Sequence, residues 1–142
     1  MPEKYPEVIV STFIINDRKE LFLVKGAKWQ NQYVIPGGHL NYAETLEDCC
    51  KREVKEETNL NVRDLEFFTC SEGIKPQDYS KKDVHFVYLY FIARAENNNL
   101  VMDEREGKEY IWISPEESLK SKNIHPGIKD LIKKLIKQKG YQ

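Results

Sequence analysis

The chain has few cysteines, no long apolar run and no excess of either charge. Only three cysteines occur among 142 residues, and none forms a C-x-x-C pair, which excludes a disulfide framework and a thiolate zinc site. No apolar stretch approaches the ~18 residues of a membrane span, and the N-terminal residues lack the apolar segment of a signal peptide. Basic and acidic residues number 22 and 23, so no overall field attracts nucleic acid or anionic membrane. We therefore expect a cytoplasmic protein without nucleic-acid or membrane partners.

What is present is typical of one globular domain over residues 1–142. A chain of this length buries roughly 70% of its unfolded surface, which is enough for a proper core. Runs of β-branched and aromatic residues predict strands at 8–15, 21–24, 29–35, 60–68, 84–93 and 110–113. Helical patterns cover 45–58 and 127–139, and a short helix begins at Ser114. The mixture predicts an α/β sandwich with a mixed sheet between helices, in which the apolar strand 84–93 is central.

Two segments allow more than one interpretation. The helix at 127–139 has one apolar stripe and many lysines, so it is either a packing helix or a basic helix on a membrane surface. We favour the packing helix, because a sheet needs such helices to cover it. Pro36-Gly37-Gly38 predicts a turn with conformations that other residues avoid. Such a turn brings backbone N–H groups near the start of the next helix, where they can face an anion.

The helix at 45–58 carries acidic residues on its apolar side. With Leu46 at zero and ~100° per residue, Glu53 and Glu57 fall at about −20° and +20°, in the middle of the stripe. Glu56 lies at its edge. Three carboxylates this close repel one another, and burial adds to the cost. Carboxylate oxygens without Cys or His ligands suit a hard divalent cation, Mg2+ or Mn2+. The alternative is a solvated acidic helix face, and the position of Glu53 and Glu57 within the apolar stripe argues against it.

The same residues resemble a known family motif. Gly38, Glu44 and the run Arg52 to Leu60 match the Nudix box, G-x5-E-x7-R-E-U-x-E-E-x-G-U, where U is a bulky aliphatic. The one departure is Asn59, which stands where the family has glycine. Asn is the next best occupant of a left-handed position after a helix, so we expect a small loss of local stability and an intact site.

The resemblance implies the Nudix fold, an α/β/α sandwich around a mixed sheet, and hydrolysis of a nucleoside diphosphate linked to another moiety. It implies Mg2+ as cofactor, with Mn2+ as a substitute, held by Glu53, Glu56, Glu57 and the Gly38 carbonyl. Arg52 would orient a helix carboxylate by a salt bridge, and Glu44 would support the loop or the metal-bound water. A further glutamate outside the box often assists in this family as ligand or base; Glu106 matches best, with Glu109 and Glu104 as alternatives.

The substrate is less narrowly indicated. Pro76, 16 residues after Leu60, resembles a marker of ADP-ribose pyrophosphatases, and the segment with Trp112 and Pro115 resembles nucleoside triphosphate hydrolases. Strand alternation puts Phe86, Tyr88 and Tyr90 on one face, which either covers a helix or floors a nucleotide cleft. The residues taken as candidates for substrate contact are Tyr33, His39, Phe86 and Tyr88.

The alternative function is a non-catalytic Nudix-like module that binds a nucleotide as a sensor or regulator. Such modules usually lose box carboxylates, whereas Glu53, Glu56 and Glu57 are all present. An enzyme with a small nucleotide substrate is therefore the prediction. Many Nudix proteins form homodimers, and the sequence leaves that open.

Overall fold

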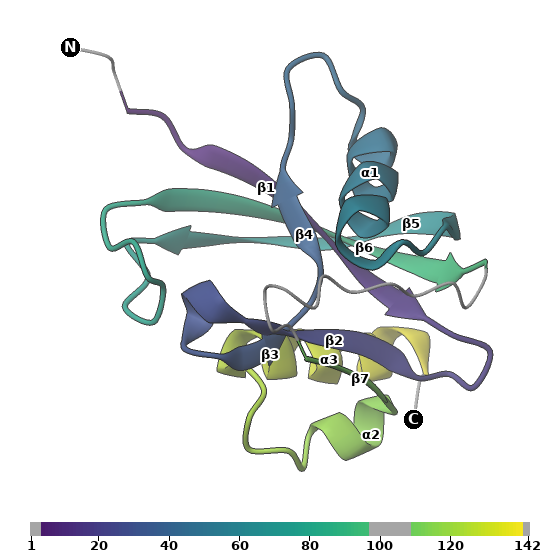
Figure 1. Cartoon of the computed structure of the whole chain (residues 1–142). Coiled ribbons are helices and arrows are strands. Elements are labelled where there is room, and N and C mark those ends of the chain that lie inside the picture. The colour runs from purple at the N-terminus through teal and green to yellow at the C-terminus, as the bar shows by residue number, and fades with distance from the viewer. Residues whose placement is uncertain (1–3, 97–108, 141–142) are drawn as a thin grey trace.

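The computed structural model describes residues 4–96 and 109–140, which are organised by one mixed β-sheet (Figure 1). Along the sheet the strand order is β3-β2-β1-β6-β5, while β4 pairs with β1 and β7 pairs with β2. The strands are β1 (Glu7–Ile15), β2 (Leu21–Gly26), β3 (Gln32–Val34), β4 (Gly37–His39), β5 (Val62–Ile74), β6 (His85–Ala95) and β7 (Tyr110–Ile113). The helices are α1 (Leu46–Thr58), α2 (Pro115–Ser118), α3 (Pro126–Lys139) and the 3-10 turn η1 (Ala27–Trp29).

The sheet forks at β1. One edge of β1 pairs in parallel with β6 along its whole length, which makes β6 an interior strand as predicted. The other edge pairs first with β4, as far as Ser11 opposite Gly37, and then with β2, where Ile15 lies opposite Leu21. Between these two partners the Thr12 N–H donates to the Pro36 carbonyl at 3.0 Å. Figure 1 shows β2 and β3 diverging from β4 beyond this point.

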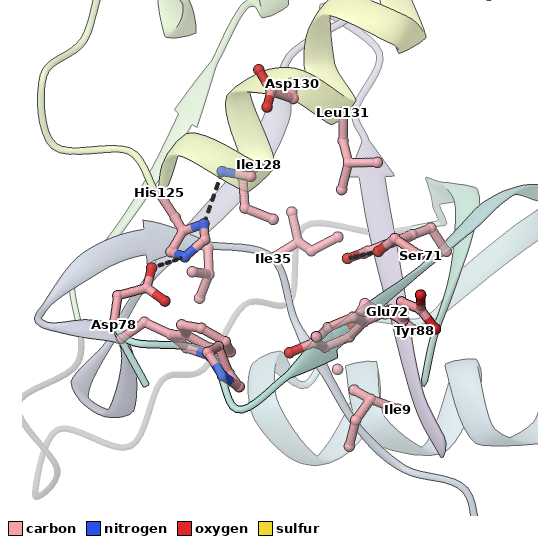
Figure 2. Close-up of a pocket in the computed structure, with 18 of the residues that line it drawn as sticks. Ile9, Ile35, Ser71, Glu72, Asp78, Tyr88, His125, Ile128, Asp130 and Leu131 are labelled. Carbon is pink, nitrogen blue, oxygen red and sulfur yellow. Dashed lines mark hydrogen bonds and ion pairs between the residues drawn. The ribbon is translucent and has the colours of Figure 1, made fainter. Parts of the chain in front are cut away.

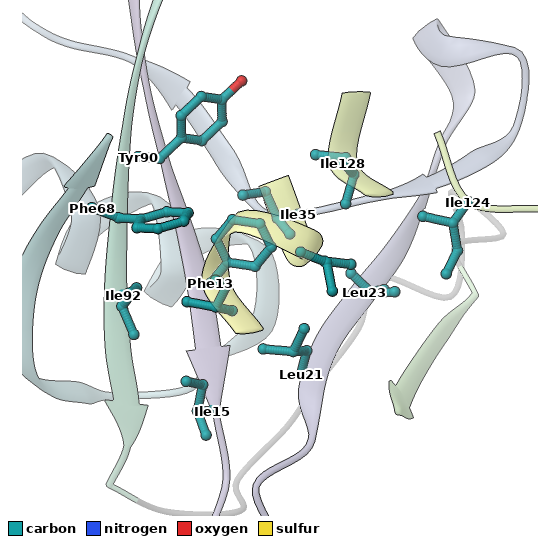
Figure 3. Packing of buried hydrophobic residues seen from close by; sticks show 12 residues of the cluster. Phe13, Ile15, Leu21, Leu23, Ile35, Phe68, Tyr90, Ile92, Ile124 and Ile128 are labelled. Atoms are coloured by element: carbon teal, nitrogen blue, oxygen red, sulfur yellow. The ribbon is translucent and has the colours of Figure 1, made fainter. Parts of the chain in front are cut away.

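Helices α1 and α3 cover opposite faces of the sheet. Alternation along β1 sends Phe13 and Ile15 into a cluster with the buried residues of α3, part of which Figure 3 shows. Ile14 packs with Val54 of α1, and Val10 packs with Cys49 and Cys50 of the same helix. The α/β/α arrangement around a mixed sheet is therefore confirmed, and both adjacent cysteines belong to the core.

The helix boundaries follow from their caps. Thr45 precedes α1, and its hydroxyl accepts the Asp48 N–H at 3.1 Å. Asn59 ends α1 with φ 64°, the left-handed conformation that its place in the box predicts. The apolar stripe of α3 is buried at Ile128, Ile132 and Leu135, which supports the packing interpretation of this helix. None of the helices in the two described ranges is long and apolar enough to cross a membrane.

The structure corrects three boundaries. Segment 29–35 is not one strand, because Gln30 and Asn31 adopt φ 60° and 59° and separate η1 from β3. Pro36-Gly37-Gly38 is not a turn: both glycines lie in β4, and neither has positive φ. The strand predicted at 60–68 continues as β5 to Ile74, because pairing with β6 extends through two irregularities in register.

Candidate active site

Glu53 and Glu57 lie one turn apart on the side of α1 that faces the sheet. Helix α1 packs over β1 and β4, and the Gly37 N–H of β4 donates to Glu57 Oε2 at 3.1 Å. The Glu53 side chain is 14% exposed, whereas that of Glu56 is 59% exposed. The angular positions derived from the sequence thus agree with the structure: two carboxylates turn inward and the third lies at the edge.

Gly37 and Gly38 are required by the close approach of neighbouring atoms and not by backbone conformation. A Cβ on Gly38 would lie 2.4 Å from the carboxylate carbon of Glu53, and a Cβ on Gly37 would lie 2.3 Å from the Ser11 hydroxyl oxygen. The expected role of this segment is therefore corrected. Its Gly37 N–H faces the Glu57 carboxylate near the end of α1 instead of an external anion at the helix start.

Arg52 ties the carboxylates of the box together. It contacts both oxygens of Glu44, with Nε at 2.7 Å and one terminal nitrogen at 3.0 Å, and that second nitrogen also donates to the His39 carbonyl. Its other terminal nitrogen donates to Glu53 Oε1 at 2.8 Å and to Glu56 Oε2 at 3.3 Å.

These contacts fix the charges of both partners. Hydrogen bonding from Arg52 is the main cause that holds the pKa of Glu44 at about 2, below its ordinary value of 4.5. The same pairing, chiefly with Glu44, raises the pKa of Arg52. At neutral pH the guanidinium is charged and Glu44 is ionised, so Arg52 stays anchored beside the helix carboxylates.

The donor chemistry of this region fits a hard divalent cation. Carboxylate oxygens line the inward side of α1, and the neighbouring thiols are unsuited as ligands, because burial raises the pKa of Cys49 to about 12 and that of Cys50 to about 11. Within residues 4–96 and 109–140, no three Asp, Glu, His or Cys side chains already form a metal-binding group. In this arrangement Arg52 and the Gly37 N–H compensate the carboxylates instead.

Of the three candidates for the additional glutamate, one lies within the described residues and two lie outside them. Glu106 and Glu104 lie outside the described residues. Glu109 is described, and its carboxylate lies 3.1 Å from Lys25 Nζ. The assignment of Gly38, Glu53, Glu56, Glu57 and Glu106 as metal ligands stays a prediction.

Two adjoining cavities open beside the box. The first, of about 500 Å3, is called the box cavity; among its lining residues are Lys25, Lys28, Gly38, His39, Glu57 and Phe86. The second, of about 540 Å3, is called the aromatic cavity and lies between α3 and the sheet (Figure 2). Among its lining residues are Trp29, Pro76, Asp78, Tyr88, Tyr90 and His125. The two share Ile9, Trp29, Val34, Ile35, Gly37 and Tyr88, so one ligand can occupy both.

The structure brings three of the four candidate substrate contacts to these cavities. His39 and Phe86 line the box cavity, and Tyr88 lines both. His39 Nε2 also lies 2.7 Å from Glu7 Oε1. Tyr33 lines neither cavity: it packs against the core on the α3 side, with Lys25 Nζ 5.9 Å from its ring centroid.

Several cavity residues were not among the site residues predicted from the sequence. His125 appears in the sequence as a turn residue before Pro126, yet it caps α3 and contacts Trp29 and Asp78. Tyr79 packs on Trp29 with ring centroids 4.6 Å apart. These residues come from η1, the β5–β6 loop and the start of α3. The His125-Pro126 pair indicates the start of a helix. It does not indicate which loop the His125 ring contacts.

Comparison with known proteins agrees with the box and the fold. The profile of the NUDIX domain matches residues 6–135. Nucleoside triphosphatase NudI of Escherichia coli K12 is 26% identical over 114 residues, which cover 77% of each chain. Two solved structures share the fold: the MutT NUDIX hydrolase of Burkholderia pseudomallei and the MutT protein of Bacillus halodurans. The first has TM-score 0.75 and 18% identity, covering 93% of this chain and 99% of that one. The second has TM-score 0.72 and 20% identity, covering 89% and 80%.

The profile match spans most of the chain, and its boundaries enclose the sheet, α1 and most of α3. It confirms the resemblance drawn from Gly38, Glu44 and the Arg52–Leu60 run. The chain belongs to the NUDIX domain family, and its enzyme class is that of a Nudix pyrophosphohydrolase.

Proposed function

We propose that the chain hydrolyses the diphosphate linkage of a nucleoside triphosphate or a nucleoside diphosphate derivative in the presence of Mg2+. The observation that carries the proposal is the position of Glu57. Its carboxylate accepts the Gly37 N–H, and Glu57 lines the same cavity as Lys25 and Lys28, so a carboxylate for a cation and basic residues for phosphate border one cavity. An anionic substrate and a divalent cation would be bound there together.

Each box residue has a distinct part in this proposal. Glu53, Glu56 and Glu57 would hold the cation, with Gly38 and Glu106 as further ligands. Bound there, Mg2+ would neutralise phosphate oxygens and lower the pKa of water. Arg52, anchored by Glu44, positions the Glu53 carboxylate through the 2.8 Å contact. One carboxylate of the group takes the proton from the attacking water.

Two substrate classes are supported by different observations. The relatives named nucleoside triphosphatase favour a nucleoside triphosphate. Pro76, the residue that resembles the ADP-ribose marker, lines the aromatic cavity, where it would meet the part of a substrate remote from the phosphates. We rank the triphosphate first, because the similarity to those relatives covers 77% of the chain and the marker is one residue.

The test is a substrate panel. Nucleoside triphosphates, ADP-ribose and other nucleoside diphosphate derivatives are incubated with Mg2+, with Mn2+ and with a chelator, and the products are identified by mass in isotopically labelled water. We expect metal-dependent release of a phosphate or nucleotide product. Cleavage of no member of the panel, together with tight nucleotide binding, would replace this proposal with the non-catalytic binding module.

A further inference from the structure

The aromatic cavity has acidic residues on several sides and a histidine–aspartate contact at one end. Asp78 lies there on the β5–β6 loop beside His125, the residue before α3 (Figure 2). Glu72 and Asp130 also line the cavity. The lining ammonium group, that of Lys134, donates to the Thr69 hydroxyl at 2.8 Å. Three carboxylates against one engaged lysine disfavour a phosphate and favour a neutral group that donates hydrogen bonds.

His125 holds the Asp78 carboxylate in place before any ligand binds. The Gly127 N–H donates to His125 Nδ1 at 3.0 Å, so Nδ1 is an unprotonated acceptor. The proton is therefore on Nε2, which contacts Asp78 Oδ2. The ring also packs edge-on against Trp29, with centroids 5.0 Å apart. One carboxylate oxygen of Asp78 thus lies against the His125 ring nitrogen, and among the described residues Oδ1 accepts no hydrogen bond.

The Tyr88 hydroxyl is a second polar group without a partner. Its oxygen is buried, and no described residue hydrogen-bonds to it, although the ring lines the cavity and stacks on Tyr90 with centroids 5.9 Å apart. Burial raises the pKa of Tyr88, so the hydroxyl keeps its proton and can donate. A buried hydroxyl without a partner lowers stability, and a ligand that pairs with it recovers that loss.

The two cavities differ in charge, so they would bind different parts of one substrate. The box cavity has Lys25 and Lys28 beside Glu57, and the aromatic cavity has acidic groups between aromatic and aliphatic walls. We propose that the aromatic cavity binds a nucleobase that bears an exocyclic amino group, with Asp78 accepting from the amine and the Tyr88 hydroxyl pairing with another polar atom of the base. This inference rests on the proposed function, because it assigns the substrate moiety remote from the diphosphate.

The experiment compares nucleotides that differ in the amino group. GTP is compared with ITP, and CTP with UTP, by kcat/KM in the wild type. We expect the amino-bearing member of at least one pair to be preferred by about tenfold or more, because a site built to accept a donor rejects the analogue that lacks it. Ratios near one in both pairs would overturn the inference.

The variant Asp78→Asn tests the residue. An amide can accept from His125 and present its NH2 group to the ligand, so the preference should fall at least severalfold or invert toward the keto base. Asp83→Asn is the matched control, since Asp83 is on the same loop, pairs with Lys4 and is not among the lining residues. An unchanged ratio in Asp78→Asn, or the same change in Asp83→Asn, would overturn the assignment of Asp78.

The variant Tyr88→Phe separates binding from structure. Because the hydroxyl has no partner in the protein alone, its removal should leave Tm unchanged or higher while KM rises severalfold. A lower Tm with unchanged KM would show a structural hydroxyl and overturn its assigned role.

Failure of the inference is distinguishable from failure of the proposed function. If no nucleotide is hydrolysed, the proposed function fails, and the same pairs are then compared by calorimetric binding to the wild type and to Asp78→Asn. A preference for the amino-bearing nucleotide that disappears in the variant supports the inference independently of turnover. Equal affinity of the wild type for both members of each pair would overturn the inference.

Discussion

Glu53 and Glu57 are alike in sequence and adjacent on α1, yet different groups compensate them. Glu53 receives a guanidinium hydrogen bond from Arg52, whereas Glu57 receives the N–H of Gly37 from the neighbouring strand. Glu57 is therefore held to β4 by a neutral donor, and Glu53 is held within its own helix by a cation. A substitution that removes the charge of Glu57 but keeps a hydrogen-bond acceptor therefore tests the role of that charge separately from the contact with Gly37.

We predict that Glu57→Gln lowers kcat by at least about 100-fold while the fold persists. The glutamine side-chain oxygen can still accept the Gly37 N–H, so Tm should change little, but the charge that holds a cation is lost. Steady-state kinetics with Mg2+ and thermal melting provide the two measurements. Glu47→Gln is the matched control, because Glu47 is exposed on the same helix. Undiminished Mg2+-dependent turnover in Glu57→Gln would refute its role as a ligand.

The Glu44–Arg52 pair predicts a pH dependence of stability. Hydrogen bonding to Arg52 holds the pKa of Glu44 at about 2 in the folded state, against an ordinary value of 4.5. The depressed pKa means that the contribution is fully present above pH 4.5 and is lost as the pH falls toward 2. The Tm difference between the wild type and Glu44→Gln should thus be constant above about pH 5 and shrink below it. A difference that does not vary between pH 6 and pH 2.5 would contradict this linkage.

At the scale of an element, the end of α1 depends on one residue in an unusual conformation. Asn59 has φ 64°, and its N–H bonds to the Lys55 carbonyl at 3.0 Å. We predict that Asn59→Gly raises the free energy of unfolding by about 0.5 kcal/mol and that Asn59→Ala lowers it by about 1 kcal/mol, because Cβ disfavours left-handed backbone.

Urea unfolding measures both variants. Asn61→Ala is the control, since Asn61 is exposed two residues further on and is not among the positive-φ residues; its effect should stay within about 0.5 kcal/mol. Equal stability of the glycine and alanine variants at position 59 would show that the conformation does not govern this helix end.

Elements with a regular hydrophobic pattern were predictable from the sequence, whereas elements whose limits depend on pairing with another strand were not. The stripe of α3 and the strand β7 follow from local patterns, and β7 has its predicted limits, Tyr110–Ile113. The extension of β5 to Ile74 depends on pairing with β6, and β4 exists because β1 lies beside it. The inward turn of Glu53 and Glu57 was predictable from angle alone. The aromatic cavity was not, because Asp78, His125 and Trp29 meet only through the tertiary fold.

For the whole molecule, metal binding should appear as added stability. A ligand that binds the folded state alone contributes about 2.7 kcal/mol at 100 times its Kd, and about 1 kcal/mol corresponds to roughly 2–4 °C in a protein near this size. We predict that millimolar Mg2+ raises Tm by a few degrees, measured by calorimetry, because it relieves repulsion among the box carboxylates. The double variant Glu53→Gln, Glu57→Gln should lose the shift. An equal shift in that variant would place the cation elsewhere.

The link between β3 and β4 consists of Ile35 and Pro36 alone, and it joins the two branches of the sheet at the fork. Lengthening it by one residue would slide β4 along β1 or lift it away, and either movement would carry Gly37 and Gly38 off the helix carboxylates. The turn at 16–20 joins β1 to β2 and forms its backbone hydrogen bonds within itself, so we expect it to accommodate extra residues. We therefore expect length variation to be tolerated between β1 and β2 and to be disruptive between β3 and β4. An insertion scan across both connections tests this: insertions between β1 and β2 should give folded, active proteins, and insertions between β3 and β4 should give inactive ones.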